Sequence, residues 1–318
     1  RSQGGYPTDG NLLAYYPGDR TRPDALEVAL VEADGKRGYT ALKDLDLYQR
    51  TVLLVPVSAT DAYVVDFFRV RGGRLHDWAL HGDCDEDVTT ACALPFGDPL
   101  PTMLLPDEKW VEPKQEAHTY PPYGMLREMR PAPLTGGLDL EFKYAGEQRQ
   151  GYRLHLLPCG EAQALLGKAP SVRRMGQGSN GDMRKGYDFW MPVLLVRRTG
   201  EGPLTSVFSA VHEPYAGSPF VSQVRALKLT PEVPLASALE VTCGEVVDTI
   251  ISLAGPADTA TTETGITLQG KLGIVRQVKG KATGLWLFDG TRLGGKGFGL
   301  TAQAAGYDGE LTGATRRG

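Results

Sequence analysis

The sequence predicts an all-β protein, with a large antiparallel β-sandwich over residues 1–230 and a smaller β-rich unit over residues 231–318. Three observations support this class. Short runs rich in β-branched and aromatic residues recur at close spacing, separated by turns. The 40 glycines and 22 prolines suit a chain with many turns. Only GEAQALLG, residues 160–167, suggests a helical turn or two.

The first elements alternate strands with turns. Residues 1–23 are punctuated by glycine and proline, so we expect loop and a short strand there. LEVALV at residues 26–31 begins a strand, and DGKRG at residues 34–38 supplies a turn. TVLLVPV at residues 51–57 is continuously apolar, which indicates a buried strand that ends or bulges at Pro56.

Residues 62–82 indicate a long β-hairpin. Two β-rich runs, 63–71 and 74–81, flank Gly72-Gly73, and paired glycines favour a primed turn because both central residues need positive φ. Such a turn would pair residues from the two runs as follows: Phe67 with Trp78, Arg69 with His76, and Asp66 with Ala79. Both faces of this hairpin are largely apolar, so we expect it inside the sandwich rather than at its rim.

The middle of the chain predicts a long loop and two further strand pairs. Residues 84–122 are polar and proline-rich, and we expect them to lie across the mouth of the sandwich. LDLEFKY at residues 138–144 alternates, which indicates a half-exposed strand that pairs with YRLHLLP at residues 152–158. Residues 192–214 indicate a hairpin with its turn at residues 199–203.

The pattern changes near residues 229–234, where we place the domain boundary. VRALKL at residues 224–229 is a short strand that falls in the sandwich. After residue 231, short strands such as ALEVTCG, DTIISLAG and GLWLFDG follow closely with glycine turns between them. These strands predict the small C-terminal β-rich unit.

Composition excludes several classes of function. The net charge of −4 gives no general attraction to nucleic acid, and no apolar run approaches the roughly 18 residues of a membrane span. Cysteines at positions 84, 92, 159 and 243 form no C-x-x-C pair, which leaves a zinc ribbon unsupported. Cys84 and Cys92 could close a small loop as a disulfide, and the alternative is four unpaired thiols. No G-x-S-x-G nucleophile elbow is present.

Three segments, in order, resemble the downstream β-sandwich region of the heparinase II/III-like polysaccharide lyases. They are LYQRTVLLVPV (residues 47–57), VDFFRVRGGRLHDWALHG (residues 65–82) and MPVLLVRRTGEGPLTSVFSAVHEPYAGSPFVSQVRALKL (residues 191–229). The resemblance spans roughly residues 1–230, and none of the three segments is a catalytic signature. Members of this family cut uronate-containing glycans such as heparin, heparan sulfate and alginate.

The resemblance implies β-elimination, in which a Tyr or His removes a proton and an Asn, His or Arg neutralises the uronate carboxylate. In the family these groups come largely from an N-terminal helical toroid, and a His-x-His-x-Asp motif helps to hold a structural divalent metal such as zinc. None of the five histidines here forms His-x-His. We therefore expect a C-terminal portion with no catalytic residues and no cofactor of its own, whose parent open reading frame encodes the toroid before Arg1.

The partners implied are an anionic polysaccharide and the toroid domain, and the expected location is periplasmic or secreted. The sandwich would then buttress the toroid and supply one wall of the substrate cleft. A different class remains open at this point. The chain could be a stand-alone carbohydrate-binding or cell-surface β-sandwich without catalysis.

Candidate ligand-binding residues in the predicted hairpin are Arg69, His76 and Trp78, which would present cations and an aromatic ring to a sugar. The alternative for His76 is a core histidine with one backbone hydrogen bond. His76 and His81 would point to opposite faces of a strand, so one metal ion could not take both. Asp66 lies in an apolar strand and needs a partner, either His81 or an arginine such as Arg50.

A second candidate is the basic and aromatic segment 171–190. Its cations are Arg173, Arg174, Arg184 and Lys185, and Tyr187, Phe189 and Trp190 follow. Guanidinium groups suit sulfate or carboxylate, and aromatic faces suit sugar rings, although basic loops are commonly just solvated. For His212-Glu213-Pro214-Tyr215 the family resemblance implies a packing or corner role.

Overall fold

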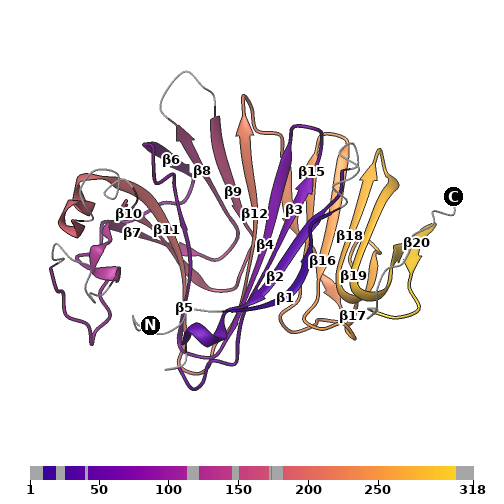
Figure 1. Cartoon of the computed structure of the whole chain (residues 1–318), viewed down its shortest axis with the longest axis horizontal. Helices are drawn as coiled ribbons and strands as arrows, with labels where there is room; N and C mark the ends of the chain where they lie inside the picture. Colours follow the sequence, from indigo (N-terminus) through magenta and orange to yellow (C-terminus); the bar gives the residue numbers. More distant parts are fainter. Residues whose placement is uncertain are drawn as a thin grey trace. The chain divides into compact units, whose positions relative to one another are not determined.

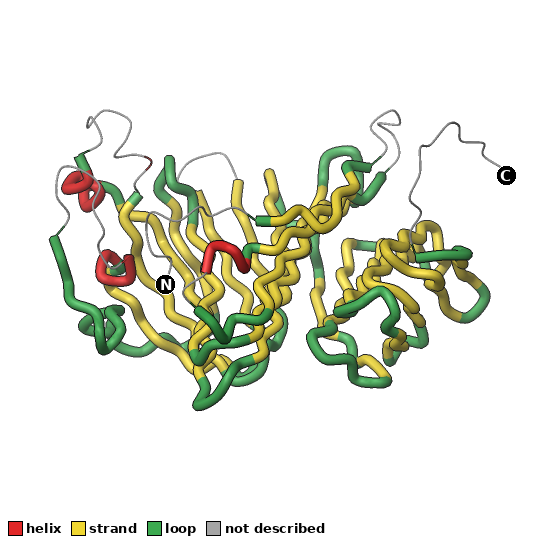
Figure 2. Tube along the Cα trace, turned by 60° about the horizontal axis from the view of Figure 1, so that its bottom comes forward, coloured by secondary structure: helices red, strands yellow, loops and turns green. Residues whose placement is uncertain are grey.

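The computed structural model describes residues 10–18, 26–39, 42–112, 122–144, 150–171, 173 and 182–305. Every strand pairing in this part of the chain is antiparallel, which confirms the all-β class (Figure 1). The helical elements with described bounds are three short 3-10 turns: η1 (Lys36–Tyr39), η2 (Pro122–Met125) and η3 (Met183–Asp188). Figure 2 shows how strongly strands dominate the trace. Among the described residues, no helix is long and apolar enough to cross a membrane.

The chain forms two compact units, Arg1–Phe220 and Val221–Gly318. Within its described residues, the first contains two sheets. Sheet A has the strand order β1 (Asn11–Tyr16), β2 (Ala29–Asp34), β3 (Leu47–Pro56), β4 (Ala62–Arg71), β12 (Thr205–Ala216), β9 (Gln150–Leu156), β8 (Leu138–Tyr144) and β6 (Val88–Cys92). Sheet B has the order β5 (Leu75–His81), β11 (Trp190–Thr199), β10 (Ala162–Pro170) and β7 (Arg127–Leu134).

Sheets A and B pack face to face around one apolar core. Phe68 and Phe208, from β4 and β12, contribute from sheet A, and Trp78 and Leu194, from β5 and β11, contribute from sheet B. We call the face of sheet A that carries Phe68 and Phe208 its inner face, and the opposite one its outer face. Strand β4 is buried on both faces, as expected for an interior strand.

The predicted hairpin at residues 62–82 is wrong. Strand β4 pairs with β3 and β12, whereas β5 lies in the other sheet and pairs with β11. Phe67 therefore lies opposite Thr51 and Ser209, and Trp78 lies opposite Val196. The remaining predicted pairs are also separated, with Arg69 opposite Gln49 and Val207, His76 opposite Arg198, and Asp66 opposite Val52 and Ala210.

The same error affects the predicted hairpin at residues 192–214, because β11 and β12 also belong to different sheets. The two segments instead form one long antiparallel ribbon that bends from sheet A into sheet B. At the bend, Gly72 N donates to Leu204 O at 2.9 Å and Leu204 N donates to Gly73 O at 2.9 Å. Both glycines have positive φ, as the sequence predicted, but they turn a corner between sheets rather than a hairpin.

Several other strand predictions are confirmed. Strand β3 ends at Pro56, and β8 pairs with β9 in the predicted way. Strand β3 is not continuously buried, however, since its residues alternate and Leu54 is exposed. The predicted helical turn at residues 160–167 is wrong, because β10 occupies most of it and buries Ala164 and Leu165 between β7 and β11. A two-sided apolar environment here outweighs helix propensity.

The second unit contains one sheet, with the order β13 (Gln223–Ala226), β15 (Ser237–Cys243), β16 (Val246–Ser252), β18 (Thr267–Val278), β17 (Thr259–Thr262) and β14 (Leu229–Thr230). Strand β19 (Lys281–Gly295) pairs with β18 and with β20 (Phe298–Thr301). The unit begins at Val221, before the expected boundary at residues 229–234. Strand β13 pairs with β15, so the short strand at residues 224–229 belongs to the second unit rather than to the sandwich.

Candidate functional site

The three candidates from the predicted hairpin are buried and are not brought together. Arg69 lies on the outer face of sheet A, with its Nη1 3.5 Å from Thr51 Oγ1. Burial lowers the pKa of Arg69 to about 10, although the negative charge of Glu32 partly offsets this lowering. His76 is a core histidine, as the alternative interpretation held, because its Nε2 lies 2.5 Å from Gly72 O and its Nδ1 2.8 Å from Ser206 Oγ. These side chains therefore offer no surface to a sugar.

The basic segment at residues 171–190 keeps two exposed guanidinium groups in the described residues. Arg173 Nε lies 2.7 Å from Asp85 Oδ1, and Arg184 Nη2 lies 2.6 Å from Asp182 Oδ2. Arg174 lies outside the described residues. Because each described arginine already faces a carboxylate, its attraction for an anionic ligand is reduced.

Sequence reasoning missed a polar cluster on the inner face of sheet A, which we call the inner cluster: Arg50, Asp66, Trp78, Tyr152 and His212. Alternation along four neighbouring strands, β3, β4, β12 and β9, brings four of these side chains to one face, and Trp78 reaches across from sheet B. The only sequence signal was a lone aspartate in an apolar strand, because the other members lie far apart in the chain.

Asp66 is the centre of the inner cluster. Arg50 donates to it through Nε at 2.8 Å and Nη2 at 2.7 Å, and Trp78 Nε1 donates at 3.3 Å. His212 Nε2 lies 3.8 Å from the same carboxylate, and His212 Nδ1 contacts the Tyr152 hydroxyl. The predicted pairing with Arg50 is thus confirmed, and the alternative with His81 is wrong, since His81 Nδ1 contacts Gly82 O at 2.7 Å.

The electrostatics of the inner cluster favour a charged carboxylate and a neutral phenol. Burial alone would raise the pKa of Asp66, but His212 and Arg50 outweigh it and the pKa is lowered. Burial, reinforced by the charge of Asp66, raises the pKa of Tyr152. The Arg50 side chain stays 51 % exposed, and its Nη1 makes no hydrogen bond with the described residues. The cluster therefore presents donors to solvent.

Beside the inner cluster, the inner face continues as an exposed surface over β1–β3, which we call the open face. Tyr15 lies opposite Val31, Val31 opposite Val52, and Val52 opposite Asp66, so one row leads from the edge strand to the cluster. Leu12 is 65 % exposed and Tyr15 63 % exposed. The other exposed apolar side chains on this face are Val31 and Leu54. Exposed apolar side chains on neighbouring strands make the open face a candidate binding surface.

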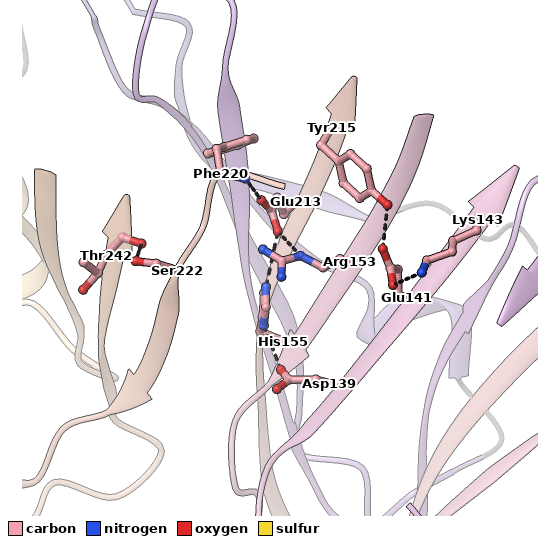
Figure 3. A network of polar contacts seen from close by, with 10 residues as sticks. All are labelled: Asp139, Glu141, Lys143, Arg153, His155, Glu213, Tyr215, Phe220, Ser222 and Thr242. Carbon is pink, nitrogen blue, oxygen red and sulfur yellow. Dashed lines mark hydrogen bonds and ion pairs between the residues drawn. The ribbon is translucent and has the colours of Figure 1, made fainter. Parts of the chain in front are cut away.

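The outer face of β8, β9 and β12 carries a second polar cluster, which we call the outer network: Asp139, Glu141, Lys143, Arg153, His155, Glu213 and Tyr215 (Figure 3). Arg153 lies opposite both Glu141 and Glu213 in the ladder. Tyr215 crosses over Gly151 to donate to Glu141 Oε1 at 2.6 Å, and a Cβ on Gly151 would lie 2.2 Å from the tyrosine oxygen. These contacts fit the packing role predicted for the Glu213 and Tyr215 segment.

Among the described residues, the cluster of potential metal ligands is Asp83, Cys84 and Asp85. Asp83 Oδ1 accepts from the amides of Asp85 and Glu86, and Arg173 contacts Asp85. The set contains no histidine and its carboxylates are already hydrogen-bonded, so it does not match the histidine-based metal site that the family resemblance implies. None of the four cysteines forms a disulfide, so no bridge joins Cys84 to Cys92.

Comparisons with known proteins returned no matching family model and no matching curated protein. The resemblance to the lyases therefore depends on the three sequence segments alone.

Proposed function

We propose that this chain is the β-sandwich portion of a periplasmic or secreted protein that acts on uronate-containing polysaccharides, and that it binds the acidic glycan on the open face beside the inner cluster. The position of Arg50 supports this proposal most directly. Its side chain is held in place by Asp66 and stays half exposed at the end of an apolar surface. The ion pair reduces its attraction for an anion, as it does for Arg173, but the Asp66 carboxylate is buried and so presents no charge of its own to a ligand on this face, whereas Asp85 is exposed. A preoriented guanidinium suits a carboxylate or sulfate group.

The open face supplies the rest of a sugar-binding surface. The exposed ring of Tyr15 offers an apolar platform with a polar tip, as sugar rings require. Tyr152 is half-buried beside His212 and adds hydrogen-bonding capacity within the inner cluster, where the row ends. This surface replaces Arg69, His76 and Trp78 as the proposed contact region in the sandwich, because the latter three are buried.

Binding is tested by calorimetry with uronate oligosaccharides and with a neutral oligosaccharide of the same length. We expect Leu54→Glu and Tyr15→Ala to weaken uronate binding at least tenfold, since one adds a negative charge to the open face and the other removes its platform. Tyr16→Ala is the matched control, because Tyr16 lies opposite Leu30 and its side chain points to the outer face. Equal binding of neutral and uronate chains, or no effect of Leu54→Glu, would rule out the proposal.

The basic segment at residues 171–190 is the competing surface, and Arg173→Ala plus Arg174→Ala tests it. Loss of binding in that double variant, with Leu54→Glu unaffected, would move the site to this segment.

Catalysis is assessed separately by following the absorbance of the unsaturated uronate product. As the family resemblance implies, we expect little or no turnover by these 318 residues, whose role is then to bind and position glycan. Turnover by this chain that disappears in Tyr152→Phe would instead make the inner cluster catalytic.

The alternative is a stand-alone carbohydrate-binding module, and the same open face would serve it. The two versions differ in the parent reading frame. A lyase parent encodes helical repeats and a His-x-His-x-Asp segment upstream, whereas a binding module does not.

A further inference from the structure

In the outer network, His155 lies between two carboxylates that belong to different strands. Its Nδ1 lies 2.7 Å from Asp139 Oδ1 on β8, and its Nε2 lies 3.5 Å from Glu213 Oε2 on β12. Asp139 is exposed and Glu213 is fully buried. The Nε2 atom is itself buried and makes no hydrogen bond with the described residues. One proton on Nε2 would therefore convert this near contact into a charged hydrogen bond.

Glu213 also holds the end of the first unit. Its Oε1 accepts from the backbone amide of Phe220 at 2.5 Å, and its Oε2 accepts from Arg153 Nε at 2.5 Å (Figure 3). Phe220 is the last residue of the first unit, and Val221 begins the second. The buried Glu213 carboxylate thus holds the backbone at Phe220, the last residue of the first unit.

The charged side chains of the outer network, as far as the structure describes them, leave room for one more cation. From β8 come Asp139, Glu141 and Lys143, from β9 comes Arg153, and from β12 come Glu213 and the neutral Tyr215. Among these described residues, three carboxylates and two cations give a net charge of −1, and protonation of His155 brings that sum to zero.

We propose that His155 is a proton-controlled clamp: when protonated, it fixes Glu213 on the Phe220 amide, and when neutral, it releases this hold on the connection to the second unit. In the neutral form the proton stays on Nδ1 to serve Asp139, so the Nε2 lone pair faces Glu213 Oε2 and repels it. Glu213 Oε2 then keeps Arg153 but loses the charged hydrogen bond from His155, so the carboxylate is held less firmly and its Oε1 loses part of its hold on the Phe220 amide.

The direction of the pH effect follows from the folded state. Burial lowers the pKa of His155, but Asp139 and Glu213 outweigh it and the pKa is raised. A raised histidine pKa means that the clamp is fully present below the unfolded value of about 6.5 and is lost as pH rises through the higher folded value. Asp139 shows the reciprocal effect, because its hydrogen bond to His155 lowers the pKa of its carboxyl.

The test is hydrogen exchange at the Phe220 amide between about pH 5.5 and 8.5, measured by NMR and corrected for intrinsic exchange. We expect protection to fall roughly tenfold across the titration of His155 in the wild-type chain, because the charged hydrogen bond to Glu213 is lost with the proton. In His155→Gln, protection should be low and independent of pH. His81→Gln, a histidine on β5 outside the outer network, should behave as wild type.

Asp139→Asn supplies a second variant that leaves His155 and Glu213 intact. This variant should keep the protection of the Phe220 amide at the acid end of the range but lose it at a lower pH than the wild-type chain does, because one of the two carboxylates that stabilise the imidazolium is gone. The proposed clamp would be refuted if the protection of the Phe220 amide did not change with pH in the wild-type chain, or if it fell by the same factor in His155→Gln. So would an unchanged midpoint in Asp139→Asn.

Discussion

Replacing Asp66 with asparagine keeps the shape of the side chain but removes the charge that Arg50 and His212 face. The carboxylate is buried, and it accepts two hydrogen bonds from Arg50 and one from Trp78. An asparagine can offer only one acceptor oxygen there, and its amide N–H would face the N–H donors of Arg50 or Trp78. The substitution therefore tests whether the inner cluster is held together by charge rather than by packing.

The expected loss of stability in Asp66→Asn depends on how exposed its partner Arg50 is. Breaking a fully buried ion pair costs about 3–5 kcal/mol, because the remaining charge is left without water. Arg50 is half exposed and can be rehydrated, so the main loss is that of charge-assisted hydrogen bonds, each worth about 1.5–3 kcal/mol. We expect Asp66→Asn to lower the free energy of unfolding of the first unit by about 2–3 kcal/mol.

The assay is urea unfolding at pH 7, followed by tryptophan fluorescence, to which Trp78 beside Asp66 contributes. Because the chain has two units, only the transition of the first unit is compared. Asp46→Asn is the matched control. Its pair with Arg71 at 2.6 Å is exposed on both sides and should be worth at most about 1 kcal/mol. Equal losses in the two variants would refute the reasoning.

The same variant gives a pH signature. The lowered pKa of Asp66 means that its contribution is present above the unfolded value of about 3.9 and is lost as pH falls through the folded value. The difference in stability between wild type and Asp66→Asn should therefore close in acid, below about pH 4. A difference that persists unchanged at lower pH would point to packing instead.

Two matched pairs of substitutions test the corner and the core, both by urea unfolding. Gly72→Ala should lower the free energy of unfolding by about 3 kcal/mol or more, because its Cβ would lie 2.0 Å from Asp44 O and its φ is +112°. Gly73→Ala should lower it by only about 1–2 kcal/mol, because φ is +73° but the space around the added carbon is open. Equal costs would argue against the close approach at the bend. Leu194→Ala, fully buried between the sheets, should cost about 2–5 kcal/mol, while Leu54→Ala on the open face should change stability by less than about 0.5 kcal/mol. A large loss at Leu54 would mean that the open face is covered.

Strand positions followed from local pattern where one face is apolar and the other polar. Strands β8 and β9 alternate cleanly, and both they and their pairing were predicted. The segment at residues 160–167 failed, because alanine and leucine suit a helix as well as a strand buried on two sides. The inner cluster could not be predicted for a different reason. Its members Arg50, Tyr152 and His212 become neighbours only through the strand order of sheet A.

The sequence by itself determined that the chain is all-β and that Gly72 and Gly73 adopt positive φ, because β-branched runs and paired glycines act through the local backbone. Tertiary structure alone decided whether those glycines turn a hairpin or a corner. The answer depends on β12 and β11, which occupy the hydrogen-bonding edges of β4 and β5 from far along the chain. Backbone donors and acceptors bond whichever strand the core places beside them, and the glycine pair permits both outcomes.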